Sequence, residues 1–250
     1  MSIEKTYGLV KKGLHPSTLT DSLDVVKQVE KYRQFWKPVR NNIVLLAESH
    51  VYTNETDFAT ECKKSLLEIL FPNYPSRYVR FVYCLGYGEN ELLDGRLEDN
   101  PGTPQYWKIF SSCVANSLND LGFHGVTKKE TPSLLQRLRN KVGVLQEMKK
   151  RGVWLLDASI VGIYRAIDDS ETKEKIIRVC WDEHVKDIIL ESRPKHIIVI
   201  GKGVEAILRY RLNKARISYT ALPQPQGVRG SSEVLSNYYS EYQKICSEFS

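Results

Sequence analysis

Several short apolar runs in this chain each end abruptly in polar residues. Residues 42–47, 153–156 and 196–200 are such runs, and longer segments with a helical spacing of apolar residues separate them. Short apolar runs between helices are typical of parallel strands that are buried on both faces. With a further strand over residues 216–221, the sequence predicts an α/β fold. We expect three α/β/α layers with a mostly parallel, four-stranded central sheet.

The other segments are predicted from apolar spacing and from the positions of proline and glycine. Residues 1–20 are expected to form an irregular lead-in, and residues 78–85 have the composition of an additional strand. Helices are predicted over residues 22–36, 57–71, 104–121, 132–151, 172–192, 204–213 and 233–249. No linker or repeat divides the chain. We therefore expect a single domain over residues 1–250, with residues 1–40 as a lead-in and a helix packed on it.

Composition indicates the cellular environment of the protein more clearly than its function. The chain has 250 residues, five scattered cysteines and a formal net charge of +6. No apolar run approaches the roughly 20 residues that span a bilayer, and the N-terminus lacks the apolar core of a signal peptide. The cysteines form no Cys-x-x-Cys pair, so we expect free thiols in a cytoplasmic protein with no metal site, no cofactor and no membrane partner. The charge permits an anionic partner such as DNA without requiring one.

The polar residues that follow the strands define a candidate site. In open parallel sheets, ligands bind just outside the carboxyl ends of the strands, so these residues are expected on one rim. The rim would hold Glu48, Ser49, His50, Asp157, Ser159, Lys202, Gln224, Gln226 and Arg229. Aromatic faces could come from Tyr83, Tyr87, Tyr106 and Trp107. Carboxylates, a histidine, a lysine and aromatic walls together favour a ligand pocket.

Structural interpretations of the same residues stay open at this point. Glu48 and Asp157 could cap the helices that follow them, and His50 could be a packing residue. The Gly201-Lys202-Gly203 turn matches only a fragment of a phosphate-binding loop. The loop over residues 222–232 is the most distinctive segment, because two prolines restrict it while its glycines let the backbone approach a ligand closely.

The order of these motifs resembles that of the uracil-DNA glycosylase superfamily over roughly residues 30–240. In that superfamily one strand ends in a Gly-Gln-Asp-Pro-Tyr or Gly-Glu-Ala-Pro-Gly motif. A middle segment reads Gly-Val-Leu-Leu-Leu-Asn-Thr, and a final loop reads His-Pro-Ser-Pro. The counterparts here are residues 47–51 (Ala-Glu-Ser-His-Val), 152–158 (Gly-Val-Trp-Leu-Leu-Asp-Ala) and 222–226 (Leu-Pro-Gln-Pro-Gln). The middle motif matches best.

The resemblance implies a DNA-binding enzyme that turns a damaged or deaminated base out of the duplex and hydrolyses its N-glycosidic bond. It implies catalytic roles for Glu48, which would assist the water, and for His50. It implies base contacts from Asp157, Ser49, Tyr83 and Tyr87, and DNA contacts from Lys202, Gln224, Gln226 and Arg229. Such a repair enzyme would work in the nucleoid or nucleus.

Two departures from the superfamily pattern are informative. The last motif has no histidine to stabilise charge on the leaving base, and Asp157 stands where the superfamily has asparagine. An ionised carboxylate only accepts hydrogen bonds, whereas an amide both donates and accepts. Uracil is therefore not the expected base, and a non-catalytic module that binds nucleic acid or a nucleotide on the same fold is the alternative. An unrelated α/β enzyme is a third possibility, although the Gly-x-Ser-x-Gly elbow of serine hydrolases is absent.

Overall fold

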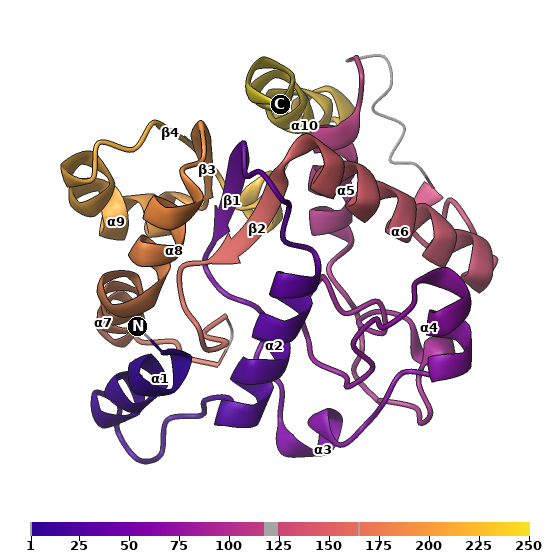
Figure 1. The fold of residues 1–250 in the computed structure, drawn as a ribbon, viewed down its shortest axis with the longest axis horizontal. Helices are drawn as coiled ribbons and strands as arrows, with labels where there is room; N and C mark the ends of the chain where they lie inside the picture. Colours follow the sequence, from indigo (N-terminus) through magenta and orange to yellow (C-terminus); the bar gives the residue numbers. More distant parts are fainter. Residues whose placement is uncertain (1, 118–124, 165) are drawn as a thin grey trace.

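Four parallel strands form the centre of the structure, a computed structural model that describes residues 2–117, 125–164 and 166–250. Their order is β2-β1-β3-β4, so the first strand of the sequence lies inside the sheet (Figure 1). The strands are β1 (Ile43–Ala47), β2 (Val153–Asp157), β3 (His196–Ile200) and β4 (Tyr219–Leu222). Ala47 is paired with Asp157, which brings the carboxyl ends of β1 and β2 together. The predicted α/β class and the parallel four-stranded sheet are confirmed.

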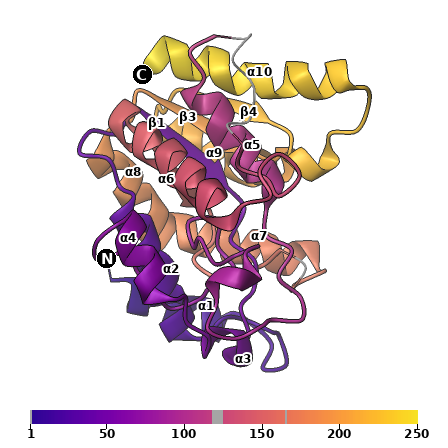
Figure 2. The same cartoon turned by 90° about the vertical axis from the view of Figure 1, so that its right-hand side faces the viewer.

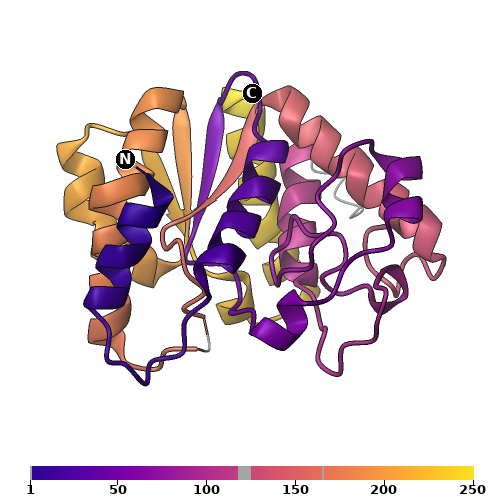
Figure 3. The same ribbon diagram turned by 60° about the horizontal axis from the view of Figure 1, so that its bottom comes forward.

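Helices cover both faces of the sheet, which gives the expected three layers (Figure 3). On one face α6 contacts β2, and α5 contacts both α6 and α10. On the other face α9 contacts β3 and β4, and α7 packs beside α9. Because both faces are covered, every residue of β1, β2 and β3 is buried. These helices are α5 (Pro104–Val114), α6 (Leu134–Arg151), α7 (Ser170–Cys180), α8 (Lys186–Ser192), α9 (Lys202–Lys214) and α10 (Ser232–Phe249).

Most helix predictions in the second half of the chain agree with these bounds. A π-helical turn over Trp181–Val185 joins α7 to α8, so residues 172–192 are continuously helical as expected. Gly152 ends α6 in the left-handed region, at φ 77°, where glycine has no steric penalty. The predicted helix over residues 104–121 ends at Val114, and part of that prediction, residues 118–121, lies outside the described residues. Figure 2 shows α10 running past α5.

The beginning of the chain is more ordered than the sequence predicted. Residues 1–20 were expected to be irregular, but α1 spans Ile3–Lys12, capped by the Ser2 hydroxyl, and packs against α7. The helix forms because Val10 and Thr6 bury on one face of it. The predicted helix over residues 22–36 is confirmed as α2 (Leu23–Phe35).

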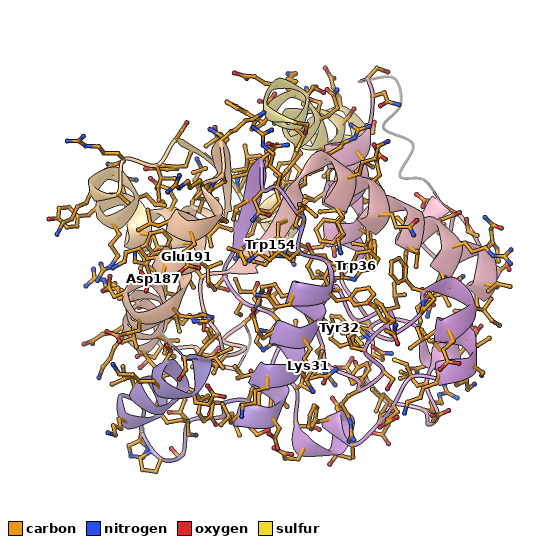
Figure 4. All side chains as sticks on the ribbon, in the orientation of Figure 1. Lys31, Tyr32, Trp36, Trp154, Asp187 and Glu191 are labelled. Carbon is orange, nitrogen blue, oxygen red and sulfur yellow. The ribbon has the colours of Figure 1, made fainter. Side chains whose placement is uncertain are left out.

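Helix α2 packs on the sheet and on the segment after α4. The Trp154 indole Nε1 donates to the backbone oxygen of Arg33 at 3.0 Å. Tyr32 and Trp36 lie on one side of α2 (Figure 4), and both rings contact the ring of Tyr74, with centroids 5.4 and 6.1 Å away. The Tyr32 hydroxyl also donates to the backbone oxygen of Pro75. This packing fixes α2 beside the carboxyl end of β2.

Two sequence predictions between β1 and β2 are wrong. Residues 78–85 form a buried run of turns instead of a strand, in which the Cys84 N–H donates to the oxygen of Phe81 at 2.8 Å. The apolar side chains are buried as they would be in a strand, but local turns and loop contacts satisfy the backbone. The predicted helix over residues 57–71 is divided into α3 (Glu55–Phe58) and α4 (Lys64–Leu70). Between these two helices, Glu61 and Cys62 form isolated β-bridges to residues of other loops, so the chain is extended there instead of helical.

Candidate functional site

A pocket opens at the carboxyl ends of β1 and β2, beside the loop that follows β4. It encloses about 510 Å³ of space unfilled by atoms, part of it open to solvent. Its lining combines two carboxylates, several aromatic rings and two glutamines. The lining residues are Glu48, Ser49, His50, Val51, Arg80, Phe81, Val82, Tyr87, Thr103, Tyr106, Leu155, Asp157, Tyr164, Gln224 and Gln226. The rim predicted from the strand ends is therefore partly assembled into one pocket.

Asp157 is held in place at this pocket by groups that converge on one of its two carboxylate oxygens. Its Oδ2 accepts from Nη2 of Arg33 at 2.9 Å and from the backbone N–H of His50 at 3.1 Å. The Nδ1 atom of His50 lies 3.4 Å from the same oxygen. Only 2% of the Asp157 side chain is exposed. Charge-assisted contacts of this kind restrict the carboxylate to one orientation.

His50 links Asp157 to a second buried carboxylate, Asp21. The His50 Nε2 atom lies 3.0 Å from Asp21 Oδ2, and neither side chain is exposed to solvent. Burial alone would lower the pKa of His50, but the negative charges of Asp21 and Asp157 outweigh it and raise the pKa to about 9. His50 is thus a buried imidazolium between two carboxylates. This geometry favours a role for His50 in positioning Asp157, and the catalytic role expected from the sequence stays a prediction.

Arg33 completes this network from α2. Its Nη1 donates to Glu30 Oε2 at 2.5 Å, and its guanidinium lies over the ring of Phe81, 5.3 Å from the centroid. Burial disfavours the charged guanidinium, but Glu30 and Asp157 raise its pKa above the ordinary value. The network therefore contains alternating charges: Glu30, Arg33, Asp157, His50 and Asp21. A buried ion network of this type requires that each charge keep its partner.

Glu48 is the carboxylate that the fold leaves available. It is half-buried and lines the pocket, and its side chain has no hydrogen-bond or ion-pair partner among the residues that the structure describes. No helix begins directly after it, because α3 starts at Glu55 with Asn54 as its cap. Asp157 likewise caps no helix, since the N-cap of α7 is Asp169. The helix-cap interpretation of both carboxylates is therefore wrong.

Ser49 and Ser159 stabilise the loops around the pocket. The Ser49 hydroxyl donates to the oxygen of His50 and accepts from the N–H groups of Ile163 and Tyr164 at 3.1 and 3.3 Å. Ser159 is buried outside the pocket lining, and its hydroxyl donates to the oxygen of Val161 at 2.7 Å. The base contact expected of Ser49 would compete with these bonds.

The aromatic walls differ in part from the prediction. Tyr87 and Tyr106 line the pocket as expected, together with Phe81 and Tyr164, which the sequence did not single out. Burial and the nearby Asp157 charge raise the pKa of Tyr106, so its hydroxyl stays protonated. Tyr83 is fully buried behind the pocket, where its hydroxyl accepts from the N–H of Leu155 at 2.9 Å. It therefore presents no face to a ligand.

Trp107 also lies outside this pocket. It lines a neighbouring cavity that shares Tyr87 and Thr103 with the pocket, and there the Lys141 ammonium lies over its ring, 5.1 Å from the centroid. In this cavity Glu89 binds Lys141 at 2.7 Å and Arg137 through both carboxylate oxygens. These residues form a second buried ion cluster, independent of the pocket.

Two of the four residues predicted to contact DNA line the pocket, and both come from the loop after β4. Gln224 and Gln226 line the pocket. A side chain at position 201 would meet Gln224 at 3.0 Å, and Gly201 has φ 119°, so glycine is required there. Lys202 and Arg229 lie outside the lining; Lys202 Nζ donates to the oxygen of Ala221 at 3.2 Å, and Arg229 is exposed.

Comparisons with known proteins identify no relative of this chain. No family model, curated protein or solved structure matches the chain. Within the described ranges, no group of three or more His, Cys, Asp or Glu side chains is placed to hold a metal ion. None of the described helices is both long and apolar enough to cross a membrane.

Proposed function

We propose that this protein is a uracil-DNA glycosylase-like hydrolase that binds a nucleobase turned out of DNA and cleaves its N-glycosidic bond. The observation that supports this proposal best is the unpartnered carboxylate of Glu48 in an aromatic-walled pocket at the ends of β1 and β2. An extruded base needs flat faces for stacking, which Phe81 and Tyr106 would supply. Gln224 and Gln226 would contact the nucleotide from the loop after β4.

The proposed chemistry uses Glu48 in two ways. The carboxylate accepts a proton from a water molecule whose oxygen forms a new bond to C1′ of the sugar. The bond from C1′ to the base nitrogen breaks, and its electron pair leaves with the base, which takes a proton from solvent. The sugar acquires positive charge as this bond weakens, and a nearby carboxylate stabilises that charge.

The second candidate is a module on the same fold that binds a base without cleaving it. It is favoured by the pairing of the cations that line the pocket. His50 faces Asp21 and Asp157, and Arg80 binds Asp57 Oδ2 at 2.7 Å as well as Asp99. Among the described residues, no cation is left unpaired at the pocket to stabilise a leaving base anion.

A single-turnover cleavage assay separates the two candidates. Oligonucleotides that each carry one altered base are incubated with the wild type, with Glu48→Gln and with the control Glu191→Gln, which changes an exposed residue of α8. The hydrolase predicts release of at least one base, with a loss of about 100-fold or more in Glu48→Gln and no change in the control. Retained cleavage in Glu48→Gln would contradict the role of Glu48. Binding without release of any base would favour the module.

A further inference from the structure

We propose that Asp157 makes the pocket select a base with two adjacent N–H donors, the edge that guanine presents, in preference to uracil. This inference rests on the base-binding part of the proposed function and specifies its substrate class. It follows from the unequal surroundings of the two oxygens of one carboxylate.

The Oδ2 atom of Asp157 has its contacts within the protein. Arg33 Nη2 and the His50 N–H donate to it, and His50 Nδ1 faces it. A rotation of the carboxylate would break these contacts, so exchanging the positions of the two oxygens costs free energy. The guanidinium of Arg33 places a positive charge 2.9 Å from this oxygen.

The Oδ1 atom has no hydrogen-bond partner among the residues that the structure describes, although the side chain is 98% buried and lines the pocket. A carboxylate oxygen accepts hydrogen bonds and donates none. Because Asp157 lines the pocket, a ligand that donates to Oδ1 is favoured over one that presents a carbonyl there.

The common bases differ in what they offer to such an acceptor. Guanine presents a ring N–H next to an amino group, and both can donate to one oxygen. Uracil presents a single ring N–H between two carbonyl groups, which a carboxylate repels. In cytosine and adenine the amino group is adjacent to an unprotonated ring nitrogen, which is itself an acceptor.

Equilibrium binding of deoxynucleosides tests this inference without requiring cleavage. Titrations followed by NMR compare 2′-deoxyguanosine with 2′-deoxyinosine, which lacks only the amino group, and with 2′-deoxyuridine. The wild type is expected to bind deoxyguanosine about 5-fold or more tightly than either of the others. Asp157→Asn should remove this preference and improve deoxyuridine binding. The control Asp94→Asn, at an exposed loop position, should leave the order unchanged.

Several results would overturn the inference. Deoxyinosine or deoxyuridine bound as tightly as deoxyguanosine would do so, and so would an unchanged preference in Asp157→Asn or no binding of any nucleoside. If Asp157→Asn does not fold, the comparison of deoxyguanosine with deoxyinosine on the wild type decides the question. The cleavage assay is separate: a guanine preference without base release contradicts only the hydrolase, and release of uracil in preference to guanine-type bases contradicts only this inference.

Discussion

The His50 imidazole and the Asp21 carboxylate form a fully buried ion pair, with Nε2 3.0 Å from Oδ2, across 29 residues of sequence. Asp21 also accepts from the backbone N–H groups of Thr53 at 2.8 Å and Gly162 at 2.5 Å. One carboxylate therefore joins the segment before α2 to the loops that follow β1 and β2. Removal of the Asp21 carboxylate should therefore affect both the free energy of unfolding and the geometry of the pocket.

Asp21→Asn is expected to lower the free energy of unfolding by about 3 kcal/mol, because it leaves a buried imidazolium with one charged partner instead of two. Urea denaturation at neutral pH measures this change. The matched control is Asp94→Asn, an exposed position where we expect less than about 0.5 kcal/mol. Equal stability of the two variants would show that the Asp21–His50 pair contributes little.

The same pair predicts a loss of stability in alkali. The pKa of His50 is raised from 6.5 to about 9 in the folded protein. A raised pKa contributes stability that is fully present below about pH 6.5 and is lost as the pH rises through 9, in total about 3 kcal/mol. The measurement is the free energy of unfolding from pH 6 to pH 10 for the wild type, His50→Gln and the exposed control His15→Gln. Only the His50 variant should show a flatter curve, and parallel curves for all three would contradict this account.

We expect the second ion cluster, around Glu89, to stabilise the fold without affecting the pocket. Glu89 is 2% exposed and pairs with both Arg137 and Lys141. Glu89→Gln should cost about 3–5 kcal/mol, because it leaves two buried cations without a countercharge. Thermal and urea denaturation would detect it, with Glu98→Gln as an exposed control. Nucleoside binding by the folded fraction should change little, since Glu89 does not line the pocket.

If the loop after β4 faces DNA, we expect Arg229 to contribute to the salt dependence of DNA binding. The side chain is exposed and has no ion-pair partner among the described residues. Arg229→Gln should weaken binding of all DNA sequences similarly and reduce the slope of log affinity against log salt by about 1. Lys31→Gln on α2 is the control for a lost surface charge (Figure 4). An unchanged slope in Arg229→Gln would remove this loop from the proposed DNA contact.

The sequence was sufficient for the sheet and for the two carboxylates at its carboxyl edge that line the pocket. Continuous apolar runs distinguish buried parallel strands, and Glu48 and Asp157 follow directly from where two such runs end. The same criterion failed for residues 78–85, because a buried loop needs apolar side chains as much as a buried strand does. What separates the two is the destination of the backbone hydrogen bonds, which composition does not encode.

The residues that hold the pocket together were not predictable in the same way. Asp21 lies in a stretch without periodicity, and Arg33 lies on an amphipathic helix where a charged residue is expected to face solvent. Their partners, His50 and Asp157, are 29 and 124 residues away in the sequence. Only the tertiary packing of α2 on the sheet turns these side chains inward. A carboxylate that follows a buried strand is a local signal, whereas the cations that neutralise it are not.

This dependence on α2 has a consequence for dividing the chain into smaller pieces. Every residue that lines the pocket lies at position 48 or later, yet Asp21 and Arg33, which hold His50 and Asp157, come before β1. A fragment that starts at β1 would carry the complete set of pocket side chains and lose the scaffold that orients two of them. In recombinant expression or domain grafting, the smallest transferable unit therefore has to begin upstream of Asp21.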